Sequence, residues 1–288
     1  MAETIDLGTV TEALNNKMDL DGANASVDIH VVENSASAHN CVYRGKNLTN
    51  VYTMAQLSAK IQANDWSDLY IGDYIEVPMT SSYGTETVRW LFAGFDTHLN
   101  RGDTATTKHH ICLVPEDCFA TTQQMNSTNT TEGGYLGSAM WTTVLPAYAT
   151  ALSNAFGSHL LQHRQILTNN MNTAVASMAG AGWTGASSGW AWTDTKVTLL
   201  NEVQVYGTTV FSSSFHDVGD SNQQLPLFRL APDHLVCGAG FNSSGRVAWW
   251  LSTVASGTYF ALVYAGGGAT GTGHASNSFG VRPLILFN

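Results

Sequence analysis

Residues 245–288 read GRVAWWLSTVASGTYFALVYAGGGATGTGHASNSFGVRPLILFN, and the architecture of the chain can be inferred outward from this stretch. It alternates between large apolar residues and runs of glycine with small polar residues. The glycines leave the backbone unrestricted, so side chains between the apolar positions can change without disturbing a core. We therefore expect an apolar frame that holds up a contact surface. The frame residues are Trp249, Trp250, Leu251, Phe260, Val263, Phe279, Val281, Leu284 and Leu286.

The same stretch offers little for catalysis. It contains no acidic residue, no cysteine and a single histidine, His274. Elsewhere the chain has no GxSxG elbow, no P-loop and no GxGxxG fingerprint. We predict that the protein is not an enzyme and has no catalytic residues.

Composition and charge exclude several classes of partner. Apolar residues make up 44% of the 288 residues and charged residues only 12%, which is typical of a mostly β, loop-rich domain. The net charge is −10 with only 12 lysines and arginines, so we expect no nucleic-acid partner. The start MAETIDLGTV has no secretory pattern, and no apolar run is long enough to span a membrane. We therefore expect that the protein does not insert into a membrane and that it is made in a reducing cytoplasm.

Metal and cofactor sites are not expected either. Asp217 and Asp220, beside His216, lack the alternating acidic ligands of a calcium loop, and a solvated turn is the better interpretation. His109 and His110 are adjacent, so on a strand they point to opposite faces, with one buried and one exposed. The cysteines lack metal-ligand spacing and are predicted to be buried free thiols. They are Cys41, Cys112, Cys118 and Cys237.

The first forty residues differ from the rest of the chain. A weakly apolar pattern from Thr4 to Met18 predicts a short helix, and a polar, glycine-containing linker follows. This segment is either a frayed terminus or an attachment and oligomerisation segment that becomes ordered against a partner. We therefore divide the chain into residues 1–40 and a domain of residues 41–288.

Local signals place the first elements of the domain. Thr53 and Gln56 stand at capping-box spacing and begin a helix that runs to Ala63. A strand follows within DWSDLYIGDYIEVPM, and the next strands are Thr87–Phe95 and His109–Pro115, with polar connections that indicate an antiparallel sheet.

Further along, proline and glycine mark the boundaries. Residues 123–131 are all polar apart from Met125 and predict a loop, and the helical region from Ser138 to Phe156 is divided by Pro146 and ends at Gly157.

The last elements before the terminal stretch are short. The run Gly180–Asp194, which carries Trp183, Trp190 and Trp192, predicts a long loop. A strand at Lys196–Leu200 precedes a helix that Asn201 caps and Gly207 ends. Of the two adjacent tryptophans, Trp250 is expected in the core, whereas Trp249 is left open between burial and exposure.

Several segments together resemble a known family. They are CVYRGKNLTNVYTMAQLSAKIQANDWSDLYIGDY, GGYLGSAMWTTVL, KVTLLNEVQVYG and the ending with WWL and SFGVRP, which span Cys41 to Asn288. The chain is similar to the C-type-lectin-like C-terminal domains of bacteriophage and prophage tail proteins, which are related to the formylglycine-generating enzyme. In the enzyme branch paired cysteines hold copper; no cysteine follows Cys237 here, so the resemblance does not carry that activity over.

The resemblance implies an α+β, C-type-lectin-like fold with a small twisted antiparallel sheet, short packed helices and long irregular loops. It also implies a binding role on a virion, and in some relatives a diversity-generating retroelement rewrites the terminal segment. Strand alternation supports contact by Leu262 and Tyr264, which lie opposite Val263. The contact positions that the resemblance implies are Arg246, Trp249, Ser252, Thr253, Tyr259, Leu262, Tyr264, Ala265, Thr270, Thr272 and His274.

The sequence thus predicts a non-enzymatic receptor-binding protein of a phage or prophage tail, with its contact surface between residues 246 and 278. The expected partners are a host-cell surface protein or glycan and, through residues 1–40, other tail proteins. A homotrimer is expected by analogy with tail fibres. The competing interpretation is a structural virion component, a decoration or fibre spacer, without a receptor of its own.

Overall fold

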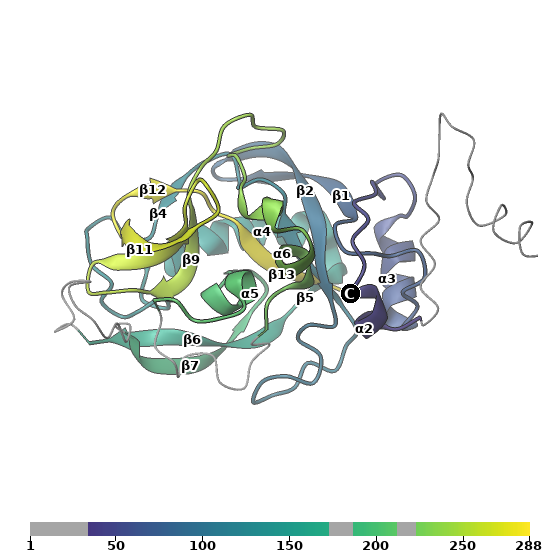
Figure 1. The fold of residues 1–288 in the computed structure, drawn as a ribbon, viewed down its shortest axis with the longest axis horizontal. Coiled ribbons are helices and arrows are strands. Elements are labelled where there is room, and N and C mark those ends of the chain that lie inside the picture. Colours follow the sequence, from purple (N-terminus) through teal and green to yellow (C-terminus); the bar gives the residue numbers. More distant parts are fainter. Residues whose placement is uncertain (1–33, 173–186, 212–222) are drawn as a thin grey trace, which may run out of the picture. The chain divides into compact units, whose positions relative to one another are not determined.

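The largest sheet is built around the last strand of the chain. In the computed structural model, which describes residues 34–172, 187–211 and 223–288, all strand pairings of this sheet are antiparallel (Figure 1). The strand order is β1-β2-β3-β13-β5, and β8 also pairs with β13. The mixture of helices with antiparallel sheets makes the fold α+β, as the sequence predicts. The strands are β1 (Tyr74–Ser81), β2 (Gly84–Phe95), β3 (Ile111–Pro115), β5 (Leu160–Leu161), β8 (Thr198–Leu199) and β13 (Pro283–Phe287).

Sequence patterns account for the centre of this sheet. The predicted strands at Thr87–Phe95 and His109–Pro115 are confirmed as β2 and β3. The strand predicted within residues 65–79 is β1, which ends two residues beyond that stretch. Every residue of β3 and of β13 is buried, because helices and loops cover both faces of the sheet there. A strand buried on both faces is a continuous apolar run, as ICLV and LILF are.

The helices begin and end where local chemistry predicts. Helix α3 (Met54–Gln62) has a complete capping box, in which the Thr53 hydroxyl accepts a hydrogen bond from the Gln56 N–H. Helix α4 (Leu145–Phe156) carries Pro146 in its first turn and ends at Gly157, whose φ is +58°. The other helical segments are α2 (Ala36–His39), η1 (Met140–Val144), η2 (Gly157–His159), α5 (Glu202–Tyr206), α6 (Pro226–Leu230) and η3 (Pro232–Leu235).

The terminal stretch forms a second sheet of three strands in the order β11-β10-β9. This sheet lies at the end of the domain away from α2 and α3, and β12 and β4 pair next to it (Figure 1). The remaining pair, β6 and β7, forms a long ribbon. The strands are β4 (Gln123–Gln124), β6 (His163–Met171), β7 (Ser187–Thr195), β9 (Trp249–Val254), β10 (Tyr259–Val263), β11 (Ala269–His274) and β12 (Ser278–Phe279).

The prediction of a loop over Gly180–Asp194 is wrong for residues 187–194, which are the part of this run that the structure describes. From Ser187 onward the chain forms β7, which pairs with β6 from Met171↔Ser187 to His163↔Thr195. Trp190 and Trp192 are half-buried in this strand, so pairing of aromatic residues with β6 outweighs the glycines around them. The polar run 123–131 is a loop except for its first two residues, which form β4.

Some predictions fall on residues that the structure does not describe. They are the helix Thr4–Met18 with its linker, Trp183, and the turn with His216, Asp217 and Asp220. Within the described residues, no helix is long and apolar enough to cross a bilayer.

Three of the cysteines are buried free thiols as predicted, but Cys41 is exposed because it follows α2 in a surface turn. The sequence gives no reason to pair any of them. The fold nevertheless places Cys118 beside Cys237, whose sulfur atoms are 3.3 Å apart.

Buried histidines connect the loop after β2 to strand β6. The rings of His98 and His163 are 5.1 Å apart, and those of His98 and His110 are 5.8 Å apart. His110 is neutral, because its Nε2 accepts a hydrogen bond from the His98 N–H and its Nδ1 faces the Lys108 carbonyl. The sequence predicts one buried and one exposed histidine on a strand. His110 is buried as predicted, but His109 is half-buried and pairs with Asp96 at 2.6 Å, and both residues lie just before β3.

Burial makes these histidines reluctant to take up protons. Desolvation and, to a lesser degree, the neighbouring histidines lower the pKa of His163 to about 3 and that of His98 well below 6.5. In the unfolded chain the same side chains take up protons from about pH 6.5 downward. Their contribution to stability is therefore present above pH 6.5 and is lost as the pH falls toward 3.

We predict that protonation of His98 and His163 in the unfolded chain lowers the free energy of unfolding by roughly 3 kcal/mol when the pH falls from about 7.5 to about 5.5. Each histidine accounts for about 1.4 kcal/mol of this change. Urea unfolding at the two pH values measures this change. The variant His163→Gln should lose about 1.4 kcal/mol less over the same interval. An equal loss in the variant would contradict the prediction.

Candidate binding surface

Strand β9 is buried on both of its faces. The indole N–H of Trp249 donates to the Leu235 carbonyl at 3.1 Å, and its ring stacks on Phe228 with centroids 6.3 Å apart. Its neighbour Trp250 donates to the Gln123 carbonyl at 2.8 Å. Both tryptophans have no exposed surface, so the structure confirms Trp250 as core and shows that Trp249 is core as well. The terminal sheet is therefore fixed to the rest of the domain from both sides.

Strand β11 alternates buried glycines with polar residues. Gly271 and Gly273 are buried, Thr272 is exposed, and Thr270 and His274 are half-buried. The hydroxyls of Thr270 and Thr272 are 3.0 Å apart, so these side chains lie on the same side of the strand. The strand is at the edge of its sheet and presents this polar side away from the core.

The glycines of β11 are required by close packing. A Cβ atom on Gly273 would lie 2.5 Å from the Trp250 ring and 2.6 Å from Leu262, and one on Gly271 would lie 2.8 Å from Phe211. The expectation that these glycines are permissive is wrong at both positions, because the strand approaches large side chains too closely for any other residue. It holds at Gly266 and Gly268, where an added Cβ would meet nothing within 4 Å.

A rigid turn presents the most exposed large side chain of the terminal stretch. Tyr264 is 63% exposed, whereas the tryptophans before it are buried. Its N–H donates to the Gly268 carbonyl at 2.7 Å, and its carbonyl accepts from the N–H of Gly267, whose φ is +89°. The Tyr206 hydroxyl donates to the Gly267 carbonyl at 3.1 Å, which ties this turn to α5.

At the other end of β11, Tyr259 and His274 lie side by side. They are register partners, and their ring centroids are 4.4 Å apart. The side-chain amide of Asn129 donates to His274 Nδ1 at 2.6 Å, while its oxygen accepts from the Ala275 N–H at 3.1 Å. Sequence reasoning missed Asn129, since nothing in a polar loop signals a contact with a histidine so distant along the chain.

The predicted contact positions divide by exposure. Arg246, Tyr264 and Thr272 are exposed, and Tyr259, Ala265, Thr270 and His274 are half-buried. The other four do not reach the surface and cannot touch a partner in this structure: they are Trp249, Ser252, Thr253 and Leu262.

Pairing on both sides explains the buried set. Leu262 lies in the central strand β10, opposite Trp250 on one side and Thr270 on the other, so its expected exposure is wrong. The Ser252 N–H donates to the Leu200 carbonyl at 2.9 Å, so β9 lies against the segment that carries β8. Arg246 belongs to the loop before β9, where the adjacent Val247 bridges to Cys237.

We call the accessible residues of the last two strands and their turn the β11 surface. It consists of Tyr259, Tyr264, Ala265, Thr270, Thr272 and His274, with Asn129 beside it. Phenol rings, hydroxyls and an imidazole on a fixed backbone suit recognition of a sugar or a protein, because few rotamers have to be frozen. The surface holds no carboxylate or cysteine, and no group of three metal-ligating side chains occurs among the described residues.

Two hollows lie elsewhere, at the base of the β6–β7 ribbon. Gln162, Asp194 and Lys196 line both. One is polar, with Lys108 on its wall, and the other is bordered by Trp141. Neither contains a residue that the sequence singles out for contact.

Comparisons with protein-family models, with curated proteins and with solved structures found no match to this chain.

The close approach of β11 to Trp250 generates a stability prediction. Gly273→Ala should lower the free energy of unfolding by about 1–3 kcal/mol, because the added methyl group overpacks the contact. Gly268→Ala is the matched control and should change it by no more than about 0.5 kcal/mol. Urea unfolding of both variants measures the difference, and equal stabilities would show that close packing does not require glycine at position 273.

Proposed function

We propose that this protein is a non-enzymatic receptor-binding protein of a phage or prophage tail, which contacts its ligand through the β11 surface. The observation that carries the proposal is the environment of Tyr264. This large side chain is 63% exposed on a turn that hydrogen bonds fix from both ends. An exposed aromatic side chain on a rigid backbone is the usual anchor of a binding surface.

The arrangement of the domain supports a C-type-lectin-like fold as its finer description. Antiparallel sheets, short helices and long connections are what that fold requires. The segment SFGVRP leads from β12 into β13, the central strand of the large sheet, so the terminal stretch is built into the core at both ends. Such a domain can vary its displayed residues while the buried frame keeps the fold.

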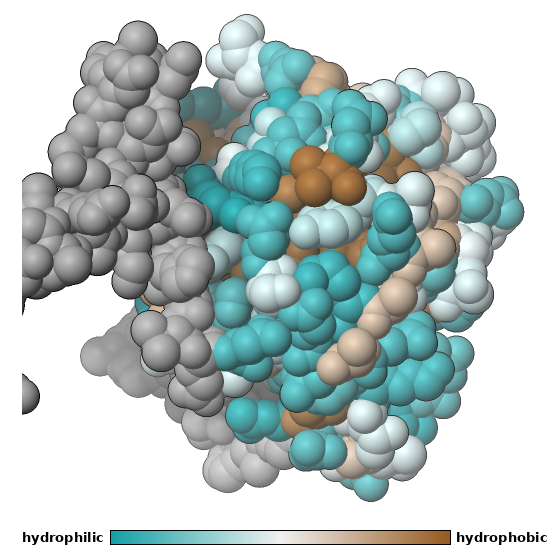
Figure 2. Space-filling model, turned by 90° about the vertical axis from the view of Figure 1, so that its right-hand side faces the viewer, coloured by the Kyte–Doolittle hydropathy of each residue, from teal (hydrophilic) through white to brown (hydrophobic). Residues whose placement is uncertain are grey.

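The surface that carries α2 and α3 is suited to contact with water. Its coloured part in Figure 2 is mostly hydrophilic, with small separate apolar areas. We propose that the partner bound by the β11 surface is a host-cell surface protein or glycan. Residues 1–40 then attach the domain to other tail proteins of the virion, in a homotrimer.

The second candidate is a structural virion component. The burial of Trp249, Ser252, Thr253 and Leu262 favours it, because these candidate contact positions serve the core. A spacer protein would also tolerate a surface of threonine and glycine. The two functions differ in whether the isolated protein binds host cells.

Tyr264→Ala should weaken binding of the purified full chain to host cells by at least about tenfold, since a hot-spot side chain contributes more than about 1.4 kcal/mol. The reason is loss of the exposed ring without any change in the core. Phe241→Ala is the matched control, because Phe241 is also an exposed aromatic side chain, 37% exposed, but lies outside the β11 surface. Absence of binding by the parent protein would favour the structural component, and equal binding by all three proteins would show that the ligand is not held through Tyr264.

The proposal extends to a diversity-generating retroelement that rewrites this surface. Sequencing codons 246–278 in many particles of one phage population tests it. We expect substitutions at the β11 surface and none at Trp249, Trp250 or Gly273. An invariant segment would remove diversification and leave a binder of fixed specificity.

A further inference from the structure

Two cysteines from distant parts of the chain meet in the core. The Sγ atoms of Cys118 and Cys237 are 3.3 Å apart, and both residues are free thiols with 5% exposure or less. Cys118 follows β3, and Cys237 precedes β9. At this distance one sulfur donates its proton to the other.

Backbone hydrogen bonds hold the two segments in place. The Cys118 N–H donates to the Gly238 carbonyl at 3.0 Å, and the Gly240 N–H donates to the Cys118 carbonyl at 2.8 Å. Gly280 lies against Cys118 so closely that a Cβ there would be 2.4 Å from the sulfur. The sulfur atoms therefore have little freedom to move apart.

A buried arginine, Arg282, forms no ion pair with a carboxylate among the described residues. Arg282 has no exposed surface, and its guanidinium donates to two neutral groups, the carbonyls of Pro115 and His234, at 2.8 and 2.6 Å. Among the described residues its Nη2 has no acceptor. An arginine stays charged in a protein, and a buried charge without an anion is costly.

The Cys237 thiolate provides that negative charge. The hydrogen bond from Cys118 lowers the pKa of Cys237, and the positive charge of Arg282 lowers it further against the effects of burial and of Asp117. Burial and the neighbouring Cys237 raise the pKa of Cys118. The two shifts have opposite directions, which favours ionisation of Cys237 while Cys118 keeps its proton.

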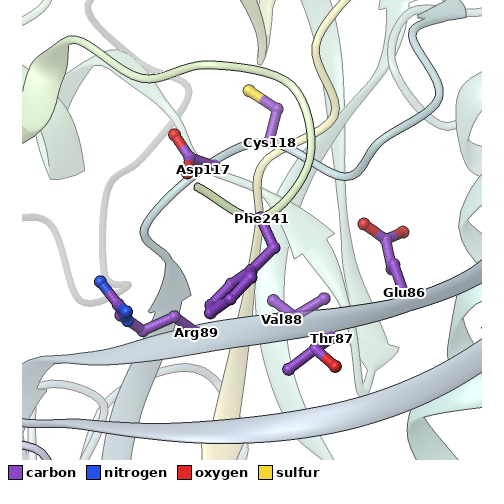
Figure 3. Close-up of a pocket in the computed structure, with 7 residues that line it drawn as sticks. All are labelled: Glu86, Thr87, Val88, Arg89, Asp117, Cys118 and Phe241. Atoms are coloured by element: carbon purple, nitrogen blue, oxygen red, sulfur yellow. The ribbon is translucent and has the colours of Figure 1, made fainter. Parts of the chain in front are cut away.

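A small pocket lies beside Cys118 (Figure 3). It is lined by Cys118 together with Asp117, Phe241, Arg89 and neighbouring residues of β2, and Cys237 is not part of its lining. The sulfur of Cys118 points away from Phe241 and from the β2 side chains. Of the two cysteines, Cys237 keeps the larger exposed fraction, 5% against 1%.

We infer that Cys118 and Cys237 form a redox-active pair, which a hydroperoxide oxidises reversibly to an intramolecular disulfide. The Cys237 thiolate attacks hydrogen peroxide; an S–O bond forms, the O–O bond breaks and hydroxide leaves. The Cys118 sulfur then attacks Cys237, so that the S–S bond forms, the S–O bond breaks and a second hydroxide leaves. The Cys118 proton joins one hydroxide, which gives the disulfide, one water and one hydroxide. Two electrons pass from the sulfurs to the peroxide.

Arg282 makes this disulfide easy to reduce. The arginine stabilises the reduced monoanion and gains nothing from the neutral disulfide, and a disulfide whose reduced form is stabilised has a higher reduction potential. The pair is thus a reversible modification site rather than a permanent cross-link. Oxidation fixes the segment before β9 to the end of β3, and this inference does not depend on the proposed binding function.

The test uses the full chain with Cys41→Ser, which removes the exposed thiol. The protein is reduced, freed of reductant, treated with hydrogen peroxide, denatured and alkylated. We expect mass spectrometry to show the loss of two thiols, a peptide that links Cys118 to Cys237, and an alkylated Cys112. Dithiothreitol should restore both thiols, and Cys237→Ser should abolish the linked peptide. Alkylation of both cysteines after excess peroxide, or separate sulfinic acids on them, would overturn the inference.

The role of Arg282 has its own readout. In glutathione redox buffers the oxidised fraction of Arg282→Met should exceed that of the parent at the same buffer ratio, with the midpoint shifted at least about fivefold toward reducing conditions. Arg282→Lys retains the charge and should keep the midpoint close to that of the parent. Equal midpoints in all three proteins would show that the arginine does not set the redox balance.

Discussion

The terminal sheet depends on burial of two adjacent tryptophans on opposite faces of β9. Trp249 contacts α6 and η3, and Trp250 contacts the β4–β12 pair. Each indole N–H has a carbonyl partner, so both rings are buried without leaving a donor unsatisfied. Because β9 is held from both sides, the strands that follow it have a fixed platform. This platform permits a turn with small residues to remain ordered at the surface.

The platform also explains how the terminal stretch separates two tasks. Glycines are needed where β11 crosses Trp250 and Phe211, and polar side chains occupy the alternate positions. Because the inner side of β11 packs through glycines, packing against the core does not restrict which side chains occupy its outer side. The outer residues are therefore free to serve recognition, and the exposed ring of Tyr264 is next to them along the chain. This separation is the physical basis for proposing a binding protein.

Sequence reasoning succeeded where the determining interaction is local. The capping box at Thr53, the helix cap at Asn201, the position of Pro146 in its helix and the strands around β2 depend on neighbours within a few residues. It failed where the partner is distant. The burial of Leu262, the contact of Gly273 with Trp250 and the pairing of Cys118 with a cysteine 119 positions away are consequences of the tertiary fold. Alternation along one strand cannot show whether a second layer covers it.

Residues 246–278 should combine a structural frame with a displayed surface. A substitution scan of this segment, scored separately for folded protein and for binding to host cells, distinguishes the two. We expect substitutions at Tyr264, Thr270 and Thr272 to abolish binding while folding is retained, whereas those at Trp249, Trp250 and Gly273 should abolish both. If binding is lost only where folding is lost, the segment has no displayed surface.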